Sequence, residues 1–257
     1  MDYLLIGLAA LIGSALTLFS GFGLGTILLP VFGLFFPIEV AIIMTSIVHF
    51  SNNVLKVILF GKNASKKIIL YFGIPGIFFA FIGAYCLKLL SKLHPFYTYN
   101  LFKHPIEVGF LKLTIGILLI IFSLIEYIPK FKNIEFDKKY LPLGGVLSGF
   151  FGGLSGHQGA LRSAFLIKIG LSKEVFIATG VVIACLVDLS RLSIYIPNII
   201  VSQANLNFKL LFVATICAFI GVYVGNKILQ KTTIKIVQKT VAILLLSYGI
   251  LLVFGIL

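Results

Sequence analysis

Apolar segments long enough to cross a membrane follow one another through almost the whole chain. They lie at about 3–36, 38–60, 68–90, 107–129, 141–171, 175–200, 208–229 and 234–257. A helix of about 20 apolar residues crosses the roughly 30 Å hydrocarbon core of a bilayer. Of the 257 residues, 60% are hydrophobic and 11% are charged, whereas soluble domains carry about 25% charged residues. We therefore expect an all-α polytopic membrane protein with a single domain over residues 1–257.

The first and fifth apolar segments are longer than one crossing, and glycines interrupt both of them. The first break contains Gly21, Gly23 and Gly25, and the second contains Gly156 and Gly159 on either side of a His-Gln pair. Non-helical backbone is tolerated at membrane depth only where it is buried in protein or lines a cavity. We therefore expect each of these segments to form a re-entrant helical hairpin, and each of the other six segments to cross once.

Short motifs recur along the chain at a nearly constant offset. Ser20-Gly21 and Glu39-Val40 return as Ser155-Gly156 and Glu174-Val175 at an offset of 135, and the pattern Ala-Phe-Ile-Gly-x-Tyr at 80–85 returns at 218–223. The offsets predict a tandem duplication, with repeat 1 at about 1–130, a charged linker at 130–139 and repeat 2 at about 140–257. Each repeat would hold one broken hairpin and three transmembrane helices. Residues 91–106 have no counterpart and are expected to form an extra loop.

Lysine and arginine gather on the cytoplasmic side of membrane proteins, so their positions test the hairpins. If both hairpins return to their own side, 14 of the 19 basic residues outside the spans fall on one side and five on the other. If the hairpins counted as crossings, the bias would vanish. With both hairpins returning to their own side, each repeat crosses the membrane three times. Because three is an odd number, the two repeats are predicted to be inverted relative to each other. Both termini are predicted to lie outside the cell.

Inverted repeats with paired broken helices are typical of secondary transporters, whose substrate site lies between the breaks. The second arm of each hairpin would direct its first N–H groups and its positive dipole end into the protein. We therefore predict an anion site lined by both breaks. The alternative is that the glycines only permit close helix packing, as in Gly145-x-x-x-Gly149 and Gly221-x-x-x-Gly225. The predicted substrate-binding residues are Gly21, Gly23, Gly25, Gly156, His157, Gln158, Gly159 and Arg162.

Ionisable residues inside spans are expensive and are commonly functional. Asp188 and Arg191 stand three residues apart, so they share a helix face and can pair; at the 135 offset they correspond to Asn53 and Lys56. We predict a transport path lined by His49, Asn53, Asp188 and Arg191, with a proton or sodium ion as a possible co-substrate. The alternative for Asp188 and Arg191 is a structural ion pair. For Lys56, the preferred interpretation is a side chain that snorkels to the membrane interface rather than one that lines the path.

These motifs resemble the sulfite exporter TauE/SafE family. The resemblance rests on Ser20-Gly21-Phe-Gly23-Leu-Gly25 with Leu29-Pro30, on Ala41 and Thr45-Ser46, and on the second glycine-rich copy at 149–159 with Ala178-Thr179. It implies an exporter of small sulfur-containing anions, such as sulfite or organosulfonates, in the inner membrane of a prokaryotic cell. A permease or channel for another small anion, such as a carboxylate, is the alternative.

Other function classes fit the sequence less well. Gly153-Leu154-Ser155-Gly156 matches the string of intramembrane serine proteases, but a serine nucleophile needs a base and no histidine follows His157. We therefore expect no enzyme activity, and the spacing of Cys and His predicts neither a metal site nor a cofactor. The net charge of +13 fits loops beside anionic lipid rather than a nucleic-acid partner.

Overall fold

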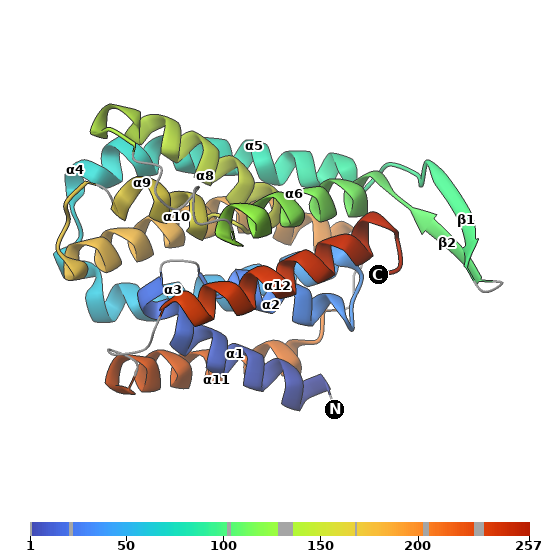
Figure 1. The fold of residues 1–257 in the computed structure, drawn as a ribbon, viewed down its shortest axis with the longest axis horizontal. Helices are drawn as coiled ribbons and strands as arrows, with labels where there is room; N and C mark the ends of the chain where they lie inside the picture. The colour runs from blue at the N-terminus through green and yellow to red at the C-terminus, as the bar shows by residue number, and fades with distance from the viewer. Residues whose placement is uncertain are drawn as a thin grey trace.

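The helices of the structure follow the predicted apolar segments closely. The structure, a computed structural model, describes residues 2–20, 23–101, 104–127, 136–167, 169–202, 206–228 and 234–257 (Figure 1). Its longer helices are α1 (Asp2–Ser20), α2 (Gly25–Gly33), α3 (Ile38–Phe60), α5 (Ile74–Leu90), α6 (Phe110–Tyr127), α8 (Leu141–Ser155), α9 (Gly159–Ile167), α10 (Lys173–Ser202), α11 (Phe208–Ile228) and α12 (Ile234–Val253). The short helix α4 (Lys66–Ile68), the π-helical turn η2 (Ile69–Gly73) and the 3-10 turns η1 (Gly61–Asn63) and η3 (Lys138–Tyr140) complete the helical elements of these residues.

The described residues include four helical stretches that are long and apolar enough to cross a membrane. They run over 38–63, 66–90, 173–197 and 208–227, and shorter apolar helices lie at 2–18, 110–125 and 239–253. Their apolar side chains face outward as well as inward, for example Ile58 and Phe212, which are 75% and 69% exposed. Outward-facing apolar surface on helices of this length is what a bilayer covers. The all-α polytopic membrane class is therefore confirmed.

Both glycine breaks separate two helices. α1 ends at Ser20 and α2 begins at Gly25, while α8 ends at Ser155 and α9 begins at Gly159. Gly23 has a φ of +87° and Gly156 a φ of +83°, a left-handed conformation that glycine adopts without steric penalty. These residues stop the first helix of each pair and turn the chain into the second. The return of each pair to its own side of a bilayer stays a prediction.

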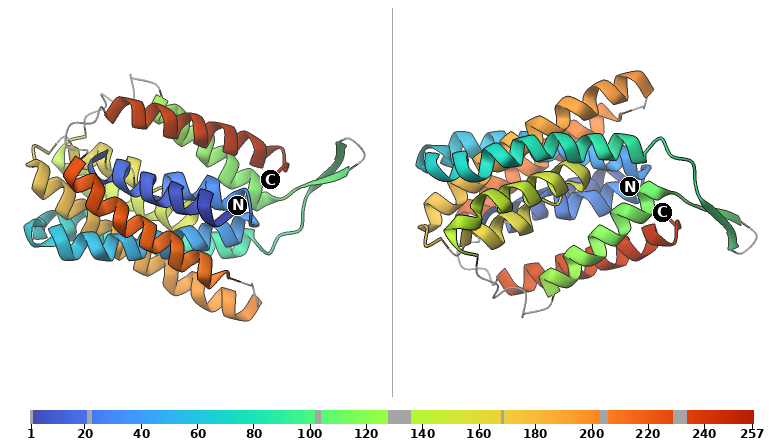
Figure 2. Two further views of the ribbon diagram at one scale, coloured as in Figure 1. Left: turned by 90° about the horizontal axis from the view of Figure 1, so that it is seen from below. Right: turned by 90° about the horizontal axis from the view of Figure 1, so that it is seen from above.

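The main helix pairs join the two halves of the chain. α1 packs along α11 and α5 along α8, while α3 packs on α10 and α6 on α12; both views of Figure 2 show α6 and α12 side by side. In each pair one helix comes from the first half and its partner from the second. The α1–α11 pair becomes the α8–α5 pair when each helix is replaced by its counterpart in the other half of the chain. Two related repeats would produce this pattern. The duplication and its inversion stay predictions.

Glycines allow the closest of these helix contacts. A methyl group on Gly145, Gly149 or Gly153 of α8 would overlap backbone carbonyls of η2 and α5, and one on Gly221 or Gly225 of α11 would overlap backbone of α1. Small residues at such positions let helix backbones approach in membranes, where van der Waals packing drives association. Close packing therefore explains these two Gly-x-x-x-Gly patterns.

The segment expected as an extra loop contains a β-hairpin instead. β1 (Tyr97–Leu101) pairs antiparallel with β2 (His104–Val108), and Tyr97 lies opposite Val108. Aromatic and β-branched residues alternate with polar ones here, as pleated strands favour. The hairpin extends beyond the helices at the end of the molecule where both termini lie (Figure 1). α4, with Lys66 and Lys67, lies at the opposite end.

Candidate functional site

Polar side chains form a buried line along the middle of α3. Thr45, His49, Asn53 and Lys56 follow one another at helical spacing, so they share one face, and all of them are buried. This face meets α10, which runs antiparallel to α3. Asp188 and Arg191 of α10 are each 0% exposed. The two central helices thus bring a carboxylate, two cations and a histidine into the interior of the molecule.

Asp188 is the centre of this cluster. Its Oδ2 atom accepts hydrogen bonds from His49 Nδ1 at 2.6 Å and Asn53 Nδ2 at 2.9 Å. Its Oδ1 atom accepts from Gln158 Nε2 at 3.0 Å and from Arg191 Nε at 3.0 Å, and the Arg191 Nη2 atom lies 2.7 Å away. The predicted Asp188–Arg191 pair is therefore confirmed. A buried charge is tolerable when it is paired and hydrogen-bonded in this way.

The cluster joins positions that correspond in the predicted duplication. Asn53 and Asp188 stand 135 residues apart and bond directly to each other. Each is followed three residues later by a cation, Lys56 in α3 and Arg191 in α10. Arg191 lies on the Asp188 carboxylate and also donates from Nη1 to the Gly152 carbonyl at 3.4 Å. Asn53 offers no charge to Lys56, so the two cations that the predicted duplication relates have different surroundings.

Gln158, in the second break, links this centre to α9. Its amide nitrogen donates to Asp188, and its Oε1 atom accepts from Arg162 Nη1 at 3.3 Å. Its backbone carbonyl accepts from the Ser148 hydroxyl at 2.9 Å, which ties the break to α8. A single side chain therefore bridges the central carboxylate and the arginine of α9.

The two glycine breaks approach each other beside the Asp188 cluster. A Cβ atom on Gly25 would lie 3.6 Å from the Gly156 carbonyl oxygen, and one on Gly23 would lie 3.0 Å from His49 Nε2. A Cβ atom on Gly156 would lie 2.7 Å from Arg191 Nη1. Side chains at Gly23 and Gly156 would therefore displace the histidine or the arginine that bonds Asp188.

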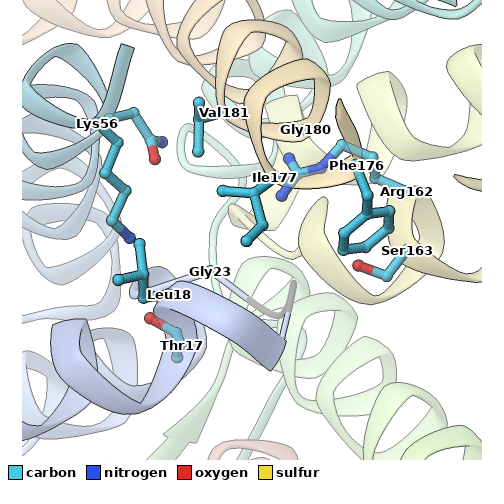
Figure 3. Close-up of a pocket in the computed structure, with 11 residues that line it drawn as sticks. Thr17, Leu18, Gly23, Lys56, Arg162, Ser163, Phe176, Ile177, Gly180 and Val181 are labelled. Atoms are coloured by element: carbon cyan, nitrogen blue, oxygen red, sulfur yellow. The ribbon is translucent and has the colours of Figure 1, made fainter. Parts of the chain in front are cut away.

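A small pocket of about 30 Å³ opens on the Lys56 side of this cluster. Figure 3 shows Lys56 entering it from α3 and the Arg162 guanidinium entering from α9 on the opposite side. Thr17, Asn53 and Ser163 supply polar groups, and Gly23 brings the first break to its wall. Among the residues that the structure describes, no carboxylate lines the pocket, and Lys56 makes no hydrogen bond or ion pair. Two long cationic side chains thus face one small space.

The sulfite exporter TauE/SafE family model matches residues 5–252 of the chain. The chain belongs to this family. No curated protein matches the sequence. Because the match covers both halves and both glycine breaks, it includes every residue of the pocket and of the Asp188 cluster. The protein is accordingly a membrane protein of a family of exporter-type transporters.

This TauE/SafE protein brings together most of the residues that the sequence predicted for its site. Gly23 and Arg162 line the pocket, while Gly25, Gly156 and Gln158 lie at the meeting point of the breaks. His49, Asn53, Asp188 and Arg191 form the central cluster. Gly159 begins α9, and Gly21 lies outside the described residues.

His157 is not among the described residues that line the pocket. Its ring stacks on Phe122 of α6, with centroids 5.9 Å apart, and its Nδ1 atom faces the Ser155 carbonyl oxygen at 3.1 Å. The Ser155 hydroxyl donates to the Phe151 carbonyl of its own helix. The serine hydroxyl and the imidazole are therefore not arranged as a nucleophile and its base. Among the described residues, no group of three or more His, Cys, Asp or Glu side chains is placed to hold a metal ion.

The interpretation of Lys56 as a snorkelling residue is wrong. Its side chain is 3% exposed and lines the pocket, because α3 continues for four residues beyond it and packs against α10 along its length. The offset of 135 residues between Lys56 and Arg191, which is buried as well, was the sequence feature that indicated a buried position for Lys56. Thr17 and Ser163 are pocket residues that sequence reasoning missed, since a single hydroxyl in an apolar helix carries no pattern of its own.

Proposed function

We propose that the protein carries small sulfur-containing oxyanions, such as sulfite or an organosulfonate, across the membrane and that the pocket between the breaks is its binding site. The observation that carries the proposal is the entry of Lys56 and Arg162 into one pocket whose described lining residues include no carboxylate. A guanidinium offers planar paired donors that match an oxyanion, and an ammonium adds a compact positive charge. The family membership supports the same substrate class.

The broken helices add partial positive charge to the same region. α2 begins at Gly25, and its N-cap residue Leu24 supplies no side-chain hydrogen bond. α9 begins at Gly159, which places Arg162 in its first turn. The first N–H groups of a helix lack intrahelical partners and favour a nearby anion. The breaks therefore contribute to the proposed site through backbone as well as side chains.

The position of the pocket suggests how access alternates. The pocket lies on the Lys56 side of Asn53, toward the end of α3 that leads to Lys62, and Phe176 and Ile177 at its rim are half-buried. The Asp188 cluster lies on its other side, toward the end with the termini. We propose that this cluster closes the path to that end and that its bonds to Asn53 and Gln158 break when the site opens there. Alternating access at a site between broken helices is the usual mechanism of such folds.

The test is transport by the purified protein in proteoliposomes. Uptake of radiolabelled sulfite is measured, with unlabelled sulfite, thiosulfate, sulfoacetate and acetate as competitors. We expect the sulfur oxyanions to compete and acetate to have little effect. Each condition is repeated with and without gradients of pH and sodium, because the sequence analysis also considers a co-transported proton or sodium ion and Asp188 with His49 offers a site for a proton.

Three variants connect transport to the pocket. Lys56→Gln and Arg162→Gln should each lower the uptake rate at least about tenfold, as the loss of a charged hydrogen bond worth about 1.5–3 kcal/mol implies. Lys62→Gln removes an exposed lysine at the same end of the molecule and should transport normally. Uptake no faster than in protein-free liposomes would refute the proposal. Competition by acetate alone would favour the carboxylate alternative.

A further inference from the structure

His49 differs from the other side chains that donate to Asp188, because its charge can change near neutral pH. The described donors to this carboxylate are His49, Asn53, Gln158 and Arg191. The two amides do not titrate and the arginine keeps its charge, whereas a histidine gains or loses a proton between about pH 5 and 8. The cluster proposed to close the path therefore includes a donor that a proton can switch between neutral and charged.

The imidazole ring of His49 reaches from this carboxylate to the wall of the pocket. Its Nδ1 atom lies 2.6 Å from Asp188 Oδ2. Its Nε2 atom, on the other side of the ring, is directed at Gly23, where a Cβ atom would lie 3.0 Å from it. Gly23 lines the pocket, and so does Asn53, whose Nδ2 atom lies 3.1 Å from His49 Nδ1. The ring nitrogen that faces away from Asp188 thus adjoins the proposed anion site.

The charges around His49 act in opposite directions. Asp188 favours a positive charge on the ring, whereas Arg191 of α10 and Lys56 of α3 oppose it. His157, in the second break, is a further titratable side chain within electrostatic reach. α2, which also packs on α3, carries no titratable side chain, and both lysines of α11 are exposed. A nearby anion would therefore shift this balance toward the protonated ring.

We infer that His49 binds a proton at Nε2 together with the anion and that the two cross the membrane in the same direction. The inference rests on the proposed function and names the partner that its transport cycle carries. An anion in the pocket offsets Lys56 and Arg191 and favours the imidazolium, and the imidazolium in turn attracts the anion, because coupling between two bound ligands is reciprocal.

The proton step changes the charge of the ring alone. A proton from the solution adds to Nε2 and turns the neutral imidazole into an imidazolium, while Nδ1 keeps its hydrogen and its bond to Asp188. Asp188 stays a carboxylate throughout. When the anion leaves, the charge that favoured the imidazolium leaves with it, so the proton is released on the same side of the membrane.

The experiment measures proton movement during anion uptake by the protein in proteoliposomes. The vesicles contain a dextran-linked pH dye, and potassium with valinomycin clamps the membrane potential. Sulfoacetate is the probe, because its sulfonate and carboxylate stay ionised in the assay, whereas sulfite itself takes up a proton near neutral pH. Its uptake should acidify the interior by about one proton per anion, as a single histidine site implies.

Binding of radiolabelled sulfoacetate to the purified protein measures the same coupling without transport. The affinity should be at least about fivefold higher at about pH 6 than at about pH 8, because the imidazolium is available only at the lower pH. Equal affinities at the two pH values would overturn the inference.

Histidine variants show whether His49 carries the proton. His49→Gln keeps an amide that can donate to Asp188 but cannot become charged, so acidification and the pH dependence of binding should disappear. His49→Asn is the second such variant, for use if His49→Gln is unstable. His157→Gln removes another buried histidine and should keep the proton signal, as should His94→Gln at an exposed position.

The outcomes separate this inference from the proposed function. Uptake of sulfoacetate without acidification in the unmodified protein would overturn the inference and leave sulfur-anion transport intact. Acidification that persists in the His49 variants, or that is lost in folded His157→Gln, would overturn it as well, because the proton would be bound elsewhere. Absence of uptake of both sulfoacetate and sulfite would overturn the proposed function itself.

Discussion

Among single residues, Asp188 connects the elements at the centre of the protein. Its carboxylate accepts hydrogen bonds from α3, from the second glycine break and from its own helix. A carboxylate left without these donors can take up a proton, whereas an arginine left without its carboxylate cannot lose its charge. The two members of the Asp188–Arg191 pair are therefore not equivalent when one is removed.

Substitutions of this pair should show that asymmetry. Asp188→Asn leaves the Arg191 cation buried without a counterion and should lower the free energy of unfolding by about 3–5 kcal/mol. Arg191→Gln should cost less, and the double variant should recover part of the loss of Asp188→Asn. Thermal unfolding of the detergent-solubilised variants measures each effect. Additive losses in the double variant would show that the two residues are not coupled.

Gly156 provides a second test at the residue scale, with Gly170 as its matched control. Both glycines have positive φ, +83° and +76°, so an alanine at either site costs about 1–2 kcal/mol of backbone strain. Only at Gly156 would the new methyl group meet Arg191, whereas nothing lies within 4 Å at Gly170. Gly156→Ala should therefore lower both stability and transport beyond the loss in Gly170→Ala. Equal losses would contradict the proposed role of this break.

Parts of this site were predictable from the sequence, and parts were not. The spacing of Asp188 and Arg191 predicts their pairing because helix geometry fixes it locally, and the glycine strings locate both breaks. The depth of Lys56 depends on how α3 lies against α10, which no local pattern specifies. His157 was expected at the anion site because it adjoins the break, but its ring packs on Phe122.

At the scale of elements, the sequence predicts helices better than it predicts how they pack. Apolar length sets the helix bounds because the bilayer requires about 20 residues per crossing. The hairpin of β1 and β2 was not predicted, because the sequence pattern of strands with only five residues is weak. The pairing of α8 with α5 comes from glycines that the sequence shows but does not assign to a partner.

The contact between α8 and α5 allows a direct test. A methyl group on Gly149 would overlap the Gly76 carbonyl of α5, whereas one on Gly109 would meet nothing within 4 Å. Gly149→Ala should force the helices apart and lower the fraction of folded protein, because membrane helices lack a strong hydrophobic force to hold a loosened contact. Gly109→Ala should resemble the unmodified protein. Size-exclusion profiles and melting temperatures compare the two, and matching values would contradict the packing account.

At the scale of the whole molecule, the two ends differ in charge and in structure. The termini and the β-hairpin occupy one end, and the lysine-bearing turn at η1 and α4 occupies the other (Figure 1). With the buried Lys56 left out of the 14, the distribution of 13 basic residues against five still predicts that the lysine-bearing end faces the cytoplasm. The termini would then face away from the cytoplasm.

Labelling of intact cells tests this orientation. In a variant whose native cysteines are replaced by alanine, a membrane-impermeant maleimide should label Thr98→Cys in β1 and should not label Lys62→Cys until the cells are lysed. Both positions are exposed, so a difference in labelling reports the side of the membrane. Labelling of Lys62→Cys in intact cells, without labelling of Thr98→Cys, would reverse the predicted topology.

We expect a sulfur oxyanion to occupy the pocket between Lys56 and Arg162. The most direct test is the protection of a cysteine placed in that pocket, at Ser163, in the same cysteine-free background. Sulfoacetate should slow alkylation of Ser163→Cys in proportion to its occupancy of the site. Alkylation of Asn63→Cys, an exposed position at the same end, should be unchanged. An unaltered rate at position 163, at sulfoacetate concentrations that saturate transport, would contradict the account.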